Sequence, residues 1–94
     1  MIVIRNTFVA KPGNASKLAA LIKESTVGMP VKNVRVMTDL TGDFNRVVFE
    51  HEAANLTEFE AAFKEYMSNP AMRDKMKGYT DLYVTGTREI FQVA

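Results

Sequence analysis

The spacing of apolar residues along this chain changes between two periods, one typical of strands and the other of helices. Residues 1–9 place a mostly apolar face opposite a mixed one, a hairpin spans residues 34–52 with alternating apolar and polar positions in its first arm, and residues 82–93 form a last strand. Between these segments, apolar residues recur at steps of three and four after Asn14 and again after Asn55, which predicts two helices. The predicted order of elements is therefore β-α-β-β-α-β.

Capping residues predict where the two helices begin and end. Asn14 or Ser16 can cap the first helix, and Gly28 stands where that helix is expected to end. Asn55 and Glu58 resemble a capping box at the start of the second helix. Such local signals place the helices at fixed positions between the strands.

The last strand differs from an ordinary strand in two ways. Residues 82–93 are about twice the usual strand length, and Gly86 within them is typical of a bulge or bend. A short helical stretch that starts at Pro70 precedes this strand. The overhang of so long a strand predicts pairing with a second chain.

The second arm of the hairpin is apolar on both of its sides around Val47, Val48 and Phe49. A sheet that helices cover on one face only should carry polar residues on the other face. We therefore expect an α+β, ferredoxin-like β-α-β-β-α-β sandwich with an antiparallel four-stranded sheet, and a further partner that covers the second face.

Length and composition indicate one globular domain over residues 1–94. Hydrophobic residues make up 47% and charged residues 24% of the chain, as in ordinary globular domains. The formal net charge of +1 gives no electrostatic argument for a nucleic acid or a membrane surface as partner. No segment approaches the roughly 20 apolar residues of a membrane span.

The chain contains no cysteine, which excludes a disulfide framework, a thiol nucleophile and a thiolate metal site. The apolar opening Met1–Ile4 is interrupted by Arg5, too early for the core of a signal peptide. We therefore expect a cytoplasmic protein. No glycine-rich phosphate loop, paired-carboxylate motif or nucleophile elbow is present.

Four segments together resemble the NIPSNAP-like and antibiotic-biosynthesis-monooxygenase-like families: Val47–Glu50, Asn55–Glu60, Tyr66–Pro70 and Gly86–Phe91. The resemblance covers essentially the whole chain. It implies membership of the dimeric α/β-barrel superfamily, in which two ferredoxin-like protomers pack sheet to sheet. It also implies a homodimer, whose second copy would cover the two-sided sheet, and a pocket in each protomer between the sheet and the helices.

The resemblance implies two kinds of chemistry. Members that degrade haem carry an asparagine near the end of strand one, which Asn6 matches, but also a tryptophan on the second helix and a histidine soon after it. This chain has no tryptophan, and residues 71–77 contain no histidine, so neither haem nor another cofactor is expected. Cofactor-independent monooxygenases of the family act on electron-rich aromatic substrates, which themselves supply electrons to oxygen. The alternative is a non-catalytic small-molecule-binding or stress-associated dimeric module.

His51 is the candidate catalytic residue because it is the only histidine, and its ordinary pKa near 6.5 suits a general base. Glu50 and Glu52 flank it and would favour its protonated form. The interpretation that the sequence favours is nevertheless an exposed histidine at a strand end. A metal site is not expected, since one histidine among scattered acids lacks ligand spacing.

Five further residues are candidates for the wall of a pocket. Asn6 lies on the apolar face of the first strand, where its amide needs a partner, either a ligand or a neighbouring strand or helix. Tyr66 and Tyr79 could line the pocket mouth with polar hydroxyl groups, and Met67 and Met72 suit an adaptable apolar cavity. Ordinary core packing is the alternative interpretation for these two tyrosines and two methionines.

Arginines on the predicted strands have a structural interpretation. Arg5, Arg35 and Arg46 would form ion pairs with acidic residues across a dimer interface, and Arg88–Glu89 would join the same set. The acids available are Asp39, Glu50 and Glu89.

Overall fold

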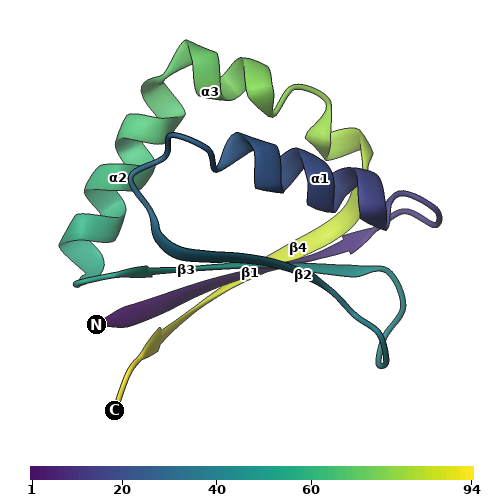
Figure 1. Cartoon of the computed structure of the whole chain (residues 1–94), viewed down its shortest axis with the longest axis horizontal. Coiled ribbons are helices and arrows are strands. Elements are labelled where there is room, and N and C mark those ends of the chain that lie inside the picture. The colour runs from purple at the N-terminus through teal and green to yellow at the C-terminus, as the bar shows by residue number, and fades with distance from the viewer.

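The computed structural model describes residues 1–94 as one layer of strands and one layer of helices (Figure 1). The elements follow in the order β1 (Ile2–Ala10), α1 (Ala15–Ser25), β2 (Lys32–Thr38), β3 (Arg46–Ala53), α2 (Leu56–Ser68), α3 (Pro70–Lys75), the 3-10 helix η1 (Tyr79–Asp81) and β4 (Tyr83–Gln92). The predicted α+β, ferredoxin-like order is confirmed, with α3 and η1 as a short extension of the second helix.

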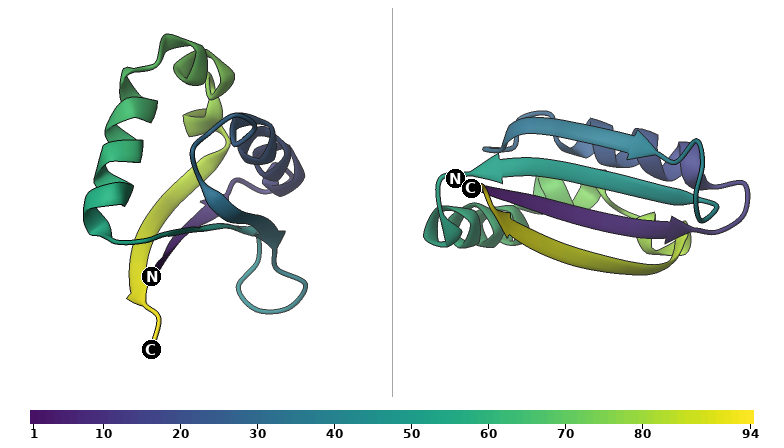
Figure 2. Two further views of the ribbon diagram at one scale, coloured as in Figure 1. Left: turned by 60° about the vertical axis from the view of Figure 1, so that its left-hand side comes forward. Right: turned by 90° about the horizontal axis from the view of Figure 1, so that it is seen from below.

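The four strands form one antiparallel sheet in the order β2-β3-β1-β4. The helices all lie on one face of this sheet, and its other face has no helix against it (Figure 2). The sheet is open, with β2 and β4 as its edges. A closed barrel would need a second chain, so the barrel and the homodimer stay predictions.

Burial along the two central strands follows the predicted alternation. The side chains of β1 and β3 that face the helices are mostly buried: Ile2, Ile4, Asn6, Ala10, Val47, Phe49, His51 and Ala53. Two of these residues, Ile4 and Val47, are completely enclosed. Two polar side chains, Asn6 and His51, therefore lie among apolar ones under the helices.

The buried hydrophobic residues form two separate clusters. The first cluster contains Ala10, Leu18, Ile22, Val47 and Phe49, and it holds α1 against the sheet. The second cluster contains Ile2, Ile4, Ala53 and Phe59, and it holds the start of α2 against the sheet. Because Ala10 and Ile2 are the two ends of β1, the clusters lie towards opposite ends of the sheet.

The helix ends match the predicted capping residues in part. Asn55 caps α2, since its Oδ1 accepts a hydrogen bond from the backbone N–H of Glu58 at 2.9 Å. Asn14 precedes α1 but makes no capping hydrogen bond with its side chain. That helix ends at Ser25, before Gly28, which instead adopts a positive φ of 84° in the following loop.

Gly86 does not form the predicted bulge. It pairs regularly with Phe8, and the irregularity lies nearer the start of β4, where Val84 is left without a partner between Thr85 and Tyr83. A Cβ atom at Gly86 would stand 3.1 Å from Cδ1 of Phe8. A side chain at this position would therefore press against the Phe8 ring of the neighbouring strand.

The sheet face away from the helices, called the open face below, combines apolar and charged side chains. It includes Val3, Arg5, Thr7, Arg35, Met37, Val48, Glu50, Glu52, Glu89 and Phe91. The ion pairs predicted across a dimer interface form within one chain: Arg5 Nε lies 2.6 Å and Arg35 Nη2 lies 2.7 Å from the carboxylate of Glu50. They form there because β1 and β2 both flank β3 in this register. Arg46 likewise pairs with Asp39 of its own hairpin, at 3.4 Å.

Candidate functional site

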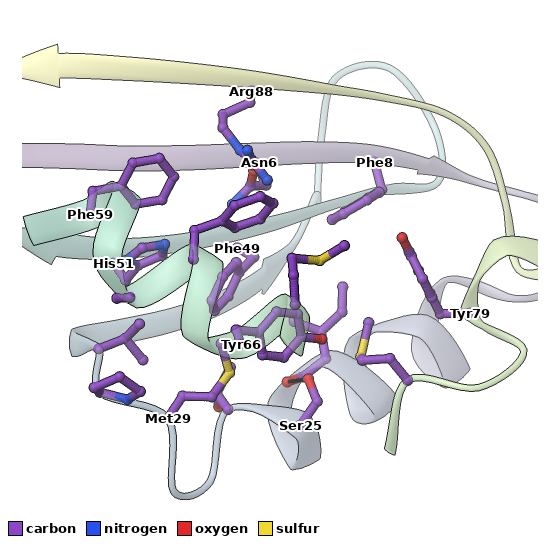
Figure 3. Close-up of a pocket in the computed structure, with 18 residues that line it drawn as sticks. Asn6, Phe8, Ser25, Met29, Phe49, His51, Phe59, Tyr66, Tyr79 and Arg88 are labelled. Atoms are coloured by element: carbon purple, nitrogen blue, oxygen red, sulfur yellow. Dashed lines mark hydrogen bonds between the residues drawn. The ribbon is translucent and has the colours of Figure 1, made fainter. Parts of the chain in front are cut away.

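A cavity of about 250 Å³ lies between the sheet and the helices. Of the 18 residues that line it, 12 are hydrophobic. The sheet forms one wall, the end of α1 and the loop after it form a second, and α2 forms a third (Figure 3). Such an apolar enclosure with a few polar groups is the usual form of a small-molecule site.

The helix α2 supplies more of the apolar wall than any other element. Phe59, Phe63, Tyr66 and Met67 face the cavity at helical steps of three and four, as the sequence pattern of this helix indicates. The rings of Phe59 and Phe63 are 5.9 Å apart. The apolar residues that make α2 amphipathic therefore line a cavity along much of the helix instead of filling a core.

His51 lies inside the fold and is only 7% exposed, so the interpretation as an exposed strand-end histidine is wrong. Strand β3 continues to Ala53, and the start of α2 packs over the imidazole, whose centroid is 5.9 Å from that of Phe59. Its Nδ1 is buried and has no hydrogen-bond partner. A buried polar atom without a hydrogen-bond partner is rare in folded proteins.

The protonation state of His51 also differs from the one expected from the sequence. Strand alternation turns Glu50 and Glu52 to the opposite face of the sheet, so neither carboxylate stabilises the imidazolium. Burial is the main cause that lowers the pKa of His51 below its ordinary value, and the positive charge of Arg88 lowers this pKa further. The imidazole is therefore neutral at physiological pH, the state that a general base requires.

The pKa of His51 can be measured directly, because the chain has no other histidine. We expect NMR titration of its ring protons to give a value below 6.5. The unfolded chain then binds more protons than the folded chain between that value and 6.5, so the free energy of unfolding should rise with pH across this window. A measured pKa above 6.5 would contradict the burial of the imidazole.

Asn6 contacts its neighbouring strand. Its Oδ1 accepts a hydrogen bond of 2.7 Å from Nε of Arg88, the residue opposite it in the pairing of β1 with β4. Asn6 is 8% exposed and lines the cavity (Figure 3). The structural partner expected from the sequence is thus present, and a contact between Asn6 and a ligand stays a prediction.

Arg88 is a cavity residue that the sequence interpretation placed elsewhere. It was expected to join the ion pairs of the open face, but alternation along β4 turns it to the face of the sheet that carries the helices and leaves only Glu89 on the open face. Its Cζ lies 4.7 Å from the ring centroid of Phe63 and 5.6 Å from that of Phe59. The signal that could have found it is its position opposite Asn6, which requires the register of β4 against β1.

The other predicted pocket residues are placed differently from one another. Tyr66, Tyr79 and Met67 line the cavity, whereas Met72 does not and instead lies close to Gly28 in the loop after α1. Burial, with a contribution from Tyr79, raises the pKa of Tyr66, so this phenol stays protonated and can donate a hydrogen bond. Met76, one turn after Met72, takes the place in the cavity wall.

The polar groups that reach the cavity do not form a metal site. No group of three or more histidine, aspartate or glutamate side chains lies close enough to hold a metal ion. No helix of the structure combines the length and apolar character needed to cross a membrane.

Comparison with solved structures supports the fold. An uncharacterized NIPSNAP domain protein from Burkholderia xenovorans superposes with a TM-score of 0.87 at 15% identity, over 100% of this chain and 95% of that chain. A NIPSNAP family protein from Agrobacterium tumefaciens gives 0.84 at 11% identity, over 99% and 92%. An antibiotic biosynthesis monooxygenase gives 0.74 at 16% identity, over 100% and 99%.

These solved structures confirm the resemblance at the level of the fold. This chain has the fold of NIPSNAP-domain and antibiotic biosynthesis monooxygenase-like proteins over its full length. No protein-family model and no curated protein matches it in sequence. Sequence identities of 11–16% support a shared fold but do not establish a shared chemical activity.

Proposed function

We propose that this protein binds a small apolar or aromatic molecule in the cavity and acts on it as a cofactor-independent monooxygenase-like enzyme. The observation that carries the proposal is His51, which lines a mostly apolar cavity of about 250 Å³ and whose Nδ1 is buried without a hydrogen-bond partner. A neutral imidazole there can accept a proton from an acidic position of the ligand. The apolar side chains of α2 would reduce the contact of the resulting anion with water.

The proposed reaction uses the ligand itself as the reductant. Removal of a proton by His51 leaves an electron-rich anion, which donates electrons to molecular oxygen. For a ring CH₂ group, one oxygen atom enters as a carbonyl and the other leaves as water with the two hydrogen atoms. The residues of this chain would bind the ligand, move its proton and exclude solvent.

A homodimer is part of the proposal. The open face carries Val3, Met37, Val48 and Phe91, with Phe91 42% exposed, and an apolar sheet face of this kind is expected to be covered by another surface. A second copy packed against it would complete the barrel that the resemblance implies. The cytoplasmic location expected from the sequence also stays a prediction.

The second candidate function is a binding module without turnover. It is supported by the same atom, because a catalytic histidine is usually oriented by a hydrogen bond to its second ring nitrogen or from a third group, and Nδ1 of His51 has no protein partner. In that case the cavity would store or carry its ligand, as in a stress-associated dimeric module.

Two experiments test these proposals. A native mass spectrum of freshly purified protein is expected to show two chains with a bound small molecule. An oxygen electrode with dithranol, an electron-rich tricyclic phenol, is expected to show uptake above the rate in buffer, and His51→Asn should abolish the excess. Uptake that His51→Asn leaves unchanged would contradict the role of His51 as base.

The remaining outcomes separate the two functions. Saturable binding of dithranol without oxygen uptake would favour the binding module over the enzyme. A monomer would contradict the homodimer.

A further inference from the structure

The cavity holds one permanent charge that no group of the protein neutralises. Arg88 is the only charged residue among the 18 that line it, and neither aspartate nor glutamate is present. The three ion pairs of the chain involve Arg5, Arg35 and Arg46, which all lie on other parts of the sheet. The cavity therefore has a net positive charge against an apolar wall.

The guanidinium of Arg88 is held in place along one edge only. Its Nε donates to Asn6 at 2.7 Å, and its plane lies near the ring of Phe63, with Cζ at 4.7 Å from the centroid. No protein group accepts a hydrogen bond from either Nη nitrogen. These Nη groups form one side of the fork that binds a planar anion with two parallel hydrogen bonds.

The surroundings of Arg88 favour an anion over other ligands. The side chain is exposed at the edge strand β4, so an anion can reach it without a rearrangement of the sheet. Arg88 is therefore the only charge in the cavity wall, and it would repel a cationic ligand. The aromatic wall of Phe59 and Phe63 leaves space for a ring beside the charged group.

We propose that the Nη groups of Arg88 bind the carboxylate of an aromatic acid, whose ring occupies the cavity between α2 and the sheet. Asn6 acts as the positioning residue that fixes the orientation of the guanidinium through Nε. The inference rests on the proposed function, in which the cavity takes an aromatic ligand, and it assigns the charge of that ligand.

The competing explanation is purely structural. Arg88 could hold α2 near β4 through its contacts with Phe59 and Phe63. In that case its replacement would lower stability but would not change the preference of the cavity for charged or neutral ligands. The preference of the cavity for an anionic over a neutral ligand therefore distinguishes an anion site at Arg88 from a purely structural role of this residue.

The test compares two probes of the same shape by isothermal titration calorimetry: 2-naphthoate, which is an anion, and 2-naphthamide, which is neutral. We expect 2-naphthoate to bind the wild-type protein about tenfold to a hundredfold more tightly, as two charge-assisted hydrogen bonds imply. Arg88→Gln should remove this preference and leave the affinity for 2-naphthamide nearly unchanged.

Arg73→Gln is the matched control. It removes the same charge from α3, outside the cavity, and should keep the full preference for 2-naphthoate. Equal affinity of the wild-type protein for both probes would overturn the anion site and leave the proposed function intact. Binding of neither probe would overturn both. A preference that survives in Arg88→Gln would overturn the role of Arg88.

Discussion

Replacement of Leu18 by alanine is expected to lower the free energy of unfolding by about 2–5 kcal/mol. Leu18 is fully buried in the first hydrophobic cluster, where it anchors α1 to the sheet. The substitution removes its apolar contacts and leaves a space that the surrounding side chains only partly fill. Urea denaturation followed by circular dichroism would measure the change.

Leu40→Ala is the matched control for this prediction. Leu40 is 98% exposed in the turn between β2 and β3, so the same chemical change should alter stability by no more than about 0.5 kcal/mol. Equal effects of the two substitutions would contradict the packing of α1 on the sheet.

Replacement of Glu50 by glutamine is expected to destabilise the protein by about 1–3 kcal/mol at pH 7. Glu50 is 4% exposed and accepts hydrogen bonds from Arg5 and Arg35. The estimate lies below that for a fully buried ion pair because the two arginine side chains are 42% and 68% exposed, so water screens them. Urea denaturation of both proteins would measure the difference.

The same comparison should depend on pH. The hydrogen bonds from Arg35 and then Arg5 lower the pKa of Glu50 below its ordinary value of 4.5. The carboxylate therefore contributes its full stabilisation above pH 4.5 and loses it as the pH falls through the lowered value. Wild type and Glu50→Gln should converge in stability at acid pH, whereas Glu52→Gln should have a much smaller effect throughout. A difference independent of pH would contradict the ionic nature of the contact.

The order of elements could be predicted from the sequence because its determinants are local. The alternation in β1, the helical spacing in α2 and the cap at Asn55 each depend on residues that are close together in the sequence. Gly86 shows the limit of such reasoning. Its role depends on the ring of Phe8 in a neighbouring strand, a contact that no local pattern indicates.

The candidate site could be predicted only in part, for the same reason. Asn6, Tyr66, Tyr79 and Met67 were identified because polar or adaptable side chains on apolar faces are visible in the sequence, and they line the cavity. The burial of His51 depends on where α2 crosses the sheet. The position of Arg88 depends on the register of β4, which the unpaired Val84 shifts by one residue.

The division of the hydrophobic core into two clusters has an evolutionary consequence. Met29, Phe63, Tyr66 and Met67 line the cavity but belong to neither cluster. Mutations at these positions can change the shape of the cavity while the packing that supports the sheet is retained. A lineage could therefore exchange one ligand for another without passing through an unfolded intermediate, which is consistent with a shared architecture at 11–16% identity.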